Sequence, residues 1–207
     1  MNKKILFIQP TIYDDAGKLL KKNRLYFVGL AHPLLSALLP EGWTSEICLE
    51  VIEEIPWDTD CDVIGIGGVG HAARRAKDIA IEFKKRGKIV FMGGPMVSLV
   101  PEVAKEYCDA VMIGDSEETM RELCLDIENN ALKPFYHKPL STLSFPIPKY
   151  ELVTKKKIGY LPELPPLYLD MTVNEYMNFV YELKFIFSFF IIRSIYIKCS
   201  CKRIFRA

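Results

Sequence analysis

Residues 62–68 read Asp-Val-Ile-Gly-Ile-Gly-Gly, and the same pattern of an apolar run that ends in glycine returns at residues 89–95 (Ile-Val-Phe-Met-Gly-Gly-Pro) and 110–115 (Ala-Val-Met-Ile-Gly-Asp). Amphipathic stretches with helical spacing separate the three runs. Short continuous apolar runs that alternate with such stretches are typical of strands in a parallel sheet covered on both faces. This part of the sequence therefore predicts an α/β domain.

Two further strands are predicted nearer the amino terminus, at residues 3–9 and 44–51. The helices that alternate with the strands are expected at residues 25–39, 72–86, 101–107 and 116–128. Pro33 is expected to confine the first helix to the residues that follow it, and Ser116 is expected to cap the last one. Five strands alternating with helices favour an open, doubly wound parallel sheet.

The domain is expected to end near residue 130, because the composition changes there. Pro134, Pro139, Pro146 and Pro148 predict an extended linker over residues 131–157. Residues 158–207 form an apolar and basic extension, which we expect to be irregular or helical and not an independent domain.

Composition excludes some classes of partner. The chain has 207 residues, 27 basic and 26 acidic side chains and a formal net charge of +1, so its overall charge attracts neither nucleic acid nor an anionic membrane. The six cysteines lie mostly in apolar segments and are expected to be buried. No signal peptide is recognised at the start, and the apolar run at residues 185–192 is too short to span a bilayer. The expected location is the cytoplasm.

The glycines also point to a binding site, because ligands of such sheets bind beyond the carboxyl ends of the strands. Small residues there let backbone approach a flat or phosphorylated ligand closely. Any single glycine is explained equally well by the needs of a turn, so the evidence is their joint occurrence. The candidate cofactor-binding residues are Pro10, Thr11, Gly67, Gly68, Val69, Gly70, His71, Gly93, Gly94, Pro95, Gly114, Asp115, Ser116 and Glu117.

Residues 62–66, 71–76, 86–95 and 109–118, together with 4–10 and 145–152, resemble the amino-terminal cobalamin-binding domain of cobalamin-dependent radical SAM proteins. The resemblance covers roughly residues 1–154. It implies a Rossmann-like, flavodoxin-like sheet whose glycine loops hold the corrin ring and the nucleotide tail of cobalamin.

Two features depart from the pattern of that family. The usual glycine-glutamate pair after the fifth strand is Gly114-Asp115 here, which keeps the acidic character. The motif Asp-x-His-x-x-Gly, which supplies a histidine ligand to cobalt in proteins of the methionine-synthase type, is absent, so no protein histidine ligand to cobalt is expected. His71 either touches the ligand or is simply a polar residue at a helix start. His32 and His137 have no motif context and are expected to be structural or exposed.

A second resemblance concerns residues 158–184, which are similar to the segment that follows the Q-loop of ABC transporter ATPases. The Gly-x-x-x-x-Gly-Lys-Ser/Thr loop that ATP chemistry requires does not occur in the chain. Cys199 and Cys201 do not match the Cys-x-x-x-Cys-x-x-Cys triplet that holds a radical SAM iron–sulfur cluster. These residues therefore predict neither ATPase activity nor a cluster, and we expect no catalysis by this chain alone.

Three functions remain open on the sequence. The leading hypothesis is a cobalamin-binding module without a radical SAM domain of its own. The second is an accessory module that acts in trans with a separate radical SAM methyltransferase. The third is a flavin- or nucleotide-binding domain of the flavodoxin type. The lack of a Ser/Thr-rich phosphate loop after the first strand argues against this third function.

Overall fold

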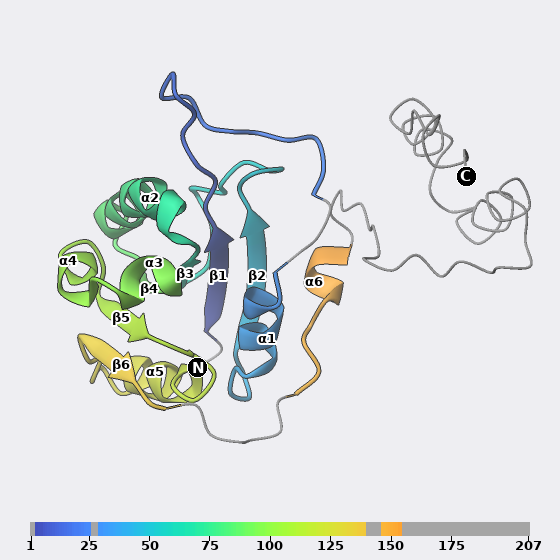
Figure 1. The fold of residues 1–207 in the computed structure, drawn as a ribbon. Coiled ribbons are helices and arrows are strands. Elements are labelled where there is room, and N and C mark those ends of the chain that lie inside the picture. The colour runs from blue at the N-terminus through green and yellow to red at the C-terminus, as the bar shows by residue number, and fades with distance from the viewer. Residues whose placement is uncertain (1–2, 26–28, 140–145, 155–207) are drawn as a thin grey trace, which may run out of the picture. The chain divides into compact units, whose positions relative to one another are not determined.

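The computed structural model describes residues 3–25, 29–139 and 146–154, all of which belong to one compact unit, Met1–Tyr160. Its centre is a sheet of six strands in the order β2-β1-β3-β4-β5-β6, with every neighbouring pair parallel (Figure 1). The strands are β1 (Lys4–Gln9), β2 (Thr44–Leu49), β3 (Val63–Gly67), β4 (Ile89–Gly93), β5 (Ala110–Ile113) and β6 (Phe135–His137). The predicted doubly wound parallel sheet is confirmed, with one strand more than expected.

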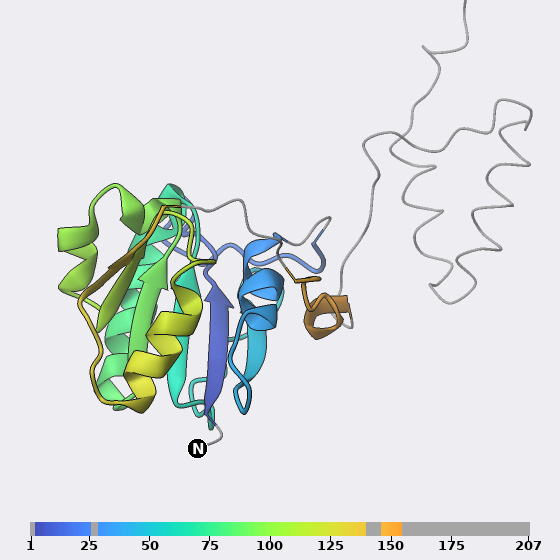
Figure 2. The same ribbon diagram turned by 90° about the horizontal axis from the view of Figure 1, so that it is seen from below.

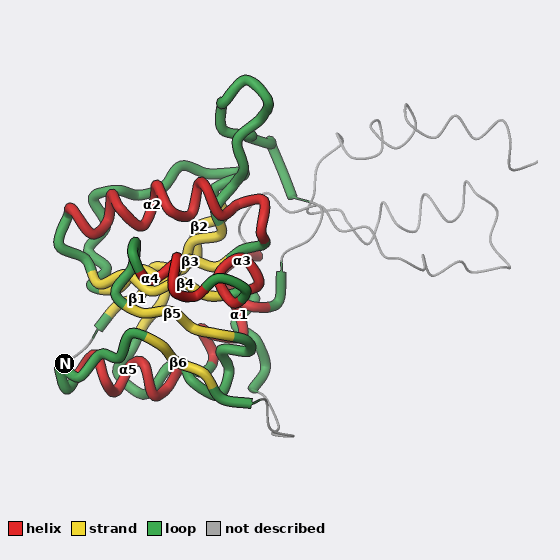
Figure 3. Tube along the Cα trace, turned by 60° about the vertical axis from the view of Figure 1, so that its left-hand side comes forward, coloured by secondary structure: helices red, strands yellow, loops and turns green. Residues whose placement is uncertain are grey.

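Helices cover both faces of the sheet, as Figure 3 shows for α2 and α5 on opposite sides. The helices are α1 (Ala31–Ala37), α2 (Ala73–Lys85), α3 (Pro95–Ser98), α4 (Pro101–Lys105), α5 (Met120–Glu128) and α6 (Glu151–Thr154), and a 3₁₀ turn, η1 (Gly70–Ala72), precedes α2. In the part of the chain that the structure describes, no helix is both long and apolar enough to cross a membrane.

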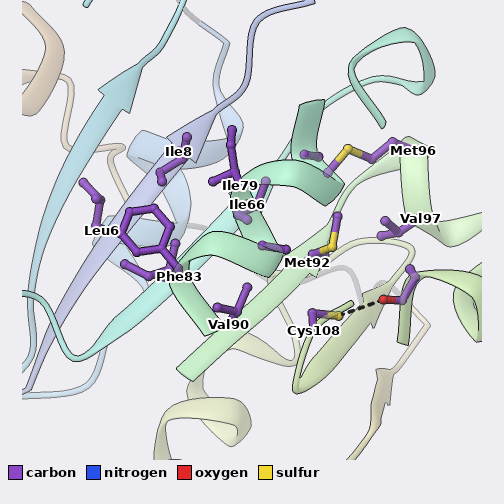
Figure 4. Packing of buried hydrophobic residues seen from close by; sticks show 14 of the residues in the cluster. Leu6, Ile8, Ile66, Ile79, Phe83, Val90, Met92, Met96, Val97 and Cys108 are labelled. Atoms are coloured by element: carbon purple, nitrogen blue, oxygen red, sulfur yellow. Dashed lines mark hydrogen bonds between the residues drawn. The ribbon is translucent and has the colours of Figure 1, made fainter. Parts of the chain in front are cut away.

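The face that carries α2, α3 and α4 is filled with aliphatic and aromatic side chains. Successive side chains of a strand point to opposite faces, so Leu6 and Ile8 of β1 point to this side. Figure 4 shows them near Ile79 and Phe83 of α2. Cys108 is buried in the same cluster, where its thiol donates a 3.3 Å hydrogen bond to the carbonyl of Ala104. The other described cysteines, Cys48, Cys61 and Cys124, are buried too, as expected.

The opposite face is covered by α5 together with α1 and α6, and it contains a strand glycine at which a side chain would overlap its neighbours. Gly65 of β3 lies in register between Phe7 of β1 and Phe91 of β4. A Cβ atom at Gly65 would lie 2.5 Å from Cζ of Phe91 and 2.9 Å from Cδ1 of Phe7. The absent side chain lets the two rings meet edge to face, with their centroids 6.2 Å apart.

The sheet continues beyond residue 130, the boundary predicted from the proline content. Strand β6 lies at the sheet edge beside β5, within the segment expected to be a linker (Figure 2). Pro134 precedes it, and its carbonyl accepts a 2.9 Å hydrogen bond from the Val111 amide. Prolines are tolerated here because an edge strand pairs on one side alone. Val153 of α6, also in that segment, is buried in the core.

Two helix starts differ from the prediction. Pro33 lies inside the first turn of α1, two residues after its start, where a missing amide hydrogen removes no intrahelical bond. Helix α5 begins at Met120 and not at Ser116. Ser116 instead opens a turn, in which its carbonyl accepts hydrogen bonds from the amides of Thr119 (3.2 Å) and Met120 (2.9 Å).

Candidate functional site

The strand order reverses between β1 and β3, because the chain adds β2 on one side of β1 and all later strands on the other. The loops that leave β1 and β3 therefore diverge, and open α/β sheets bind their ligands in the crevice that this creates. A cavity of about 380 Å³ lies at this point. Its walls come from the carboxyl ends of β1, β3, β4 and β5, the loops that follow them, and α1.

Most of the residues predicted to bind a cofactor line this cavity. Twelve of the fourteen do so: Pro10, Gly67, Gly68, Val69, His71, Gly93, Gly94, Pro95, Gly114, Asp115, Ser116 and Glu117. The exceptions among the predicted residues are Thr11 and Gly70. The structure thus brings together four loops that are distant in sequence, as the parallel arrangement of the strands requires.

The floor of the cavity is formed by glycines on the same sheet face as Phe7 and Phe91. Gly67 and Gly93 are paired in register at the ends of β3 and β4. A Cβ atom at Gly93 would lie 3.5 Å from Ser116 Oγ and 3.6 Å from Met112 Cβ, both of residues that line the cavity. Side chains at these positions would occupy the space that is now open.

The loops after β3 and β4 touch each other directly. The Met96 amide donates a 3.3 Å hydrogen bond to the Gly68 carbonyl. Gly94 has φ of +88°, and a Cβ there would lie 3.0 Å from that same carbonyl oxygen. Both the left-handed backbone and the close approach require glycine at 94.

Ser98 joins the loop after β4 to the loop after β5, a role that the sequence analysis missed. Its hydroxyl donates to the Gly94 carbonyl at 3.0 Å and accepts from the Gly114 amide at 3.0 Å. The bond to Gly94 is local, but the bond from the Gly114 amide comes from the tertiary fold, so the sequence around Ser98 gives no signal of the link between the two loops.

Thr11 holds the loop after β1 in place without lining the cavity. Its amide donates a 2.9 Å hydrogen bond to Glu50 Oε2, and its hydroxyl donates to the Leu20 carbonyl at 2.6 Å. Glu50 is buried at the end of β2 and also accepts hydrogen bonds from Arg75 Nε (2.9 Å) and Nη2 (2.6 Å). This network fixes the loop that carries Pro10 to the cavity.

The three histidines differ in their environments. His32, which was expected to be structural or exposed, is 7% exposed and lines the cavity. Its ring lies 5.9 Å from that of Phe7, and burial lowers its pKa to about 4. His71 is exposed at the rim of the cavity. His137 is exposed, with Nδ1 at 3.1 Å from the Ile113 carbonyl oxygen.

The sequence analysis also missed the apolar walls of the cavity, namely Phe7, Leu35, Phe91 and Met112. Phe7, Gly65 and Phe91 lie on one sheet face because β1, β3 and β4 pair in that register, which the sequence alone did not show. Together with the glycine floor, these side chains suit a flat and largely apolar group. Among the described lining residues, the carboxylates are Asp115 and Glu117, and none is lysine, arginine or cysteine.

The described residues contain no group of three or more His, Cys, Asp or Glu side chains placed to hold a metal ion.

Comparison with known proteins relates the chain to methyltransferases. It is 36% identical over 108 residues to bacteriochlorophyllide d C-8(2)-methyltransferase of Chlorobaculum tepidum, an alignment that covers 52% of this chain and 24% of that protein. It is 31% identical over 154 residues to bacteriochlorophyllide d C-12(1)-methyltransferase of the same organism, covering 70% of this chain and 32% of that protein. The chain thus spans about a quarter of one relative and a third of the other.

No family model matches the chain, and no solved structure matches it. The similarity of residues 158–184 to ABC transporter ATPases gains no support from the two methyltransferases. That segment lies outside the described residues, as does the pair Cys199 and Cys201.

Proposed function

We propose that residues 1–154 form a cobalamin-binding module that serves a methyltransferase reaction. The observation that carries the proposal is the cavity at the β1/β3 switch point, which is lined by the glycine loops on which the resemblance to cobalamin-binding domains rests. The similarity to two methyltransferases supports it. Bound cobalamin supplies a cobalt centre that can carry a methyl group.

The dimensions of the cavity suit one part of this cofactor. A volume of about 380 Å³ lies at the small end of the range of roughly 300–1,000 Å³ for ligand pockets. A nucleotide tail with a bicyclic base fits such a space, whereas the corrin macrocycle is too broad for it. In our proposal the tail contacts the glycine floor and the walls formed by Phe7 and Phe91, and the corrin covers the rim at Val69, His71 and Pro95.

The residues of this chain would bind and orient the cofactor, and the catalytic step would belong elsewhere. We propose that a radical SAM domain outside these residues performs the reaction, acting in trans where it is a separate protein. Copurification of an iron–sulfur protein with this chain would support that arrangement. As the Asp-x-His-x-x-Gly motif is absent, we propose that no histidine of this chain ligates cobalt.

Binding of FMN is the second candidate, because the order β2-β1-β3-β4-β5 is also the order found in flavodoxin. Flavodoxin-type proteins need free donors after the first strand to hold a phosphate group. Here the amide and hydroxyl of Thr11 already donate to Glu50 and Leu20. The loop after β1 therefore offers no free donor from Thr11 to a phosphate, and this favours cobalamin over FMN.

The proposal is tested by titrating the purified full chain with hydroxocobalamin while following the visible spectrum, with FMN in parallel. We expect saturable binding of hydroxocobalamin with a spectral shift. Gly93→Val should abolish it, because valine suits a strand end but projects into the cavity. Thr44→Val is the matched control, since Thr44 is exposed at the start of β2 and does not line the cavity.

Circular dichroism must show that both variants are folded. Equal binding by the wild type and Gly93→Val would place the ligand elsewhere. Binding of FMN without binding of hydroxocobalamin would refute the proposed function and favour the flavodoxin-like alternative.

A further inference from the structure

His32 is a buried polar side chain whose ring nitrogens have no hydrogen-bond partner among the described residues. It lies in the first turn of α1, where its backbone carbonyl accepts a 2.8 Å hydrogen bond from Ser36 Oγ. No described residue donates to or accepts from its imidazole nitrogens. Its contacts are instead with an aromatic ring, that of Phe7, and with the backbone of Gly67.

The ring nitrogens of His32 have access to the cavity. Among the described residues, no side-chain nitrogen or oxygen atom is both sealed from open space and without a hydrogen-bond partner. His32 lines the cavity, and no described residue competes with a ligand for its ring nitrogens. A Cβ atom at Gly67 would lie 2.9 Å from Nε2, so glycine at 67 leaves room for this ring.

The surroundings of His32 define the chemistry of a matching ligand. Phe7 and Phe91 form apolar walls, and Gly67 and Gly93 keep the floor flat. Ser116 is the other buried polar side chain among the described residues that line the cavity. A neutral imidazole offers one donor and one acceptor and no charge, which suits the nitrogen-bearing edge of a planar ring better than a phosphate.

We propose that the imidazole of His32 forms a hydrogen bond to the edge of a planar heteroaromatic group that enters this cavity. The inference rests on the proposed function where it identifies that group as the nucleotide base of cobalamin. The isoalloxazine ring of FMN has the same chemistry, so the test has an arm for each ligand. His32 is a binding residue in this proposal and not a ligand to cobalt.

The test uses the ¹⁵N-labelled full chain and long-range ¹H–¹⁵N spectra of the histidine rings, recorded before and after saturation with hydroxocobalamin or FMN. His32→Gln assigns the His32 resonances, and His137→Gln, at an exposed site outside the cavity, is the matched control. We expect hydroxocobalamin to shift the His32 ring nitrogens. We also expect His32→Gln to weaken binding about tenfold, and His137→Gln to leave it unchanged, because a lost hydrogen bond costs up to about a factor of ten.

The outcomes separate the two proposals. Binding of hydroxocobalamin without a shift at His32 would overturn the role of His32 and leave the proposed function standing. A His32 shift with FMN alone would support the role of His32 and refute cobalamin as the ligand. No shift with either ligand would overturn the inference, and the spectra of the wild type decide this even where His32→Gln does not fold.

Discussion

The ion pair between Glu50 and Arg75 connects the sheet to the loop after β1, and its removal gives the sharpest test of the structure. The Glu50 side chain is 1% exposed and that of Arg75 13% exposed. Glu50 accepts three hydrogen bonds, two from Arg75 and one from the Thr11 amide. Arg75→Met would leave the carboxylate buried with the Thr11 amide alone.

Removing one partner of a buried ion pair typically costs about 3–5 kcal/mol, because the remaining charge is left uncompensated. We expect Arg75→Met to lower the free energy of unfolding by that amount. The double variant Glu50→Gln with Arg75→Met should recover part of the loss, since it no longer buries a charge. The expected coupling in this double-mutant cycle is about 2 kcal/mol.

The assay is urea unfolding of the full chain at neutral pH, followed by circular dichroism. Arg74→Met is the matched control, because Arg74 is exposed and lies over the Tyr13 ring at 4.8 Å. Its loss should cost less than about 1 kcal/mol. A cost below about 1 kcal/mol for Arg75→Met, or a double variant whose loss equals the sum of the two single losses, would refute the reasoning.

Three further predictions concern other parts of the domain. Burial lowers the pKa of His32 to about 4 in the folded chain, against about 6.5 in the unfolded chain. The free energy of unfolding should therefore fall as the pH is lowered from 6.5 to 4, and the fall should be about 3 kcal/mol larger in the wild type than in His32→Gln. Urea titrations at the two pH values that gave equal losses for both proteins would contradict this. Gly65→Ala should cost about 1–3 kcal/mol in urea unfolding, because its Cβ would overlap Phe91, whereas Gly70→Ala should have little effect. Tyr136→Phe should lower the free energy of unfolding by about 1–2 kcal/mol, because the buried hydroxyl donates to Asp126 at 2.8 Å and accepts from the Lys133 amide at 3.0 Å. An unchanged midpoint of thermal unfolding would show that neither hydrogen bond stabilises the domain.

The sequence was sufficient to predict the parallel sheet and about half of the residues that line the cavity, and the reason is physical. Strands covered on both faces are continuously apolar, and the βα loops carry glycine, so both signals are local. Strand β6 was not predicted, because it has only three residues at a sheet edge and proline on either side of it.

The remaining features depend on residues that are distant in sequence. His32 faces Gly67, and Thr11 donates to Glu50, across separations that no local pattern encodes. The carboxylate of Glu50 looks like an ordinary strand-end glutamate until the fold brings Arg75 to it. Long-range pairs of this kind were therefore the part of the site that the sequence could not predict.

The glycine floor of the cavity also has a thermodynamic consequence. Because residues 67 and 93 are glycines, no side chains fill the space above the sheet at these positions. A ligand seated there completes the core and binds the folded chain alone, so it raises stability by about 2.7 kcal/mol at a free concentration a hundred times its dissociation constant. The lifetime of this domain in a cell would then follow the supply of its ligand, and empty copies would be the first to be degraded.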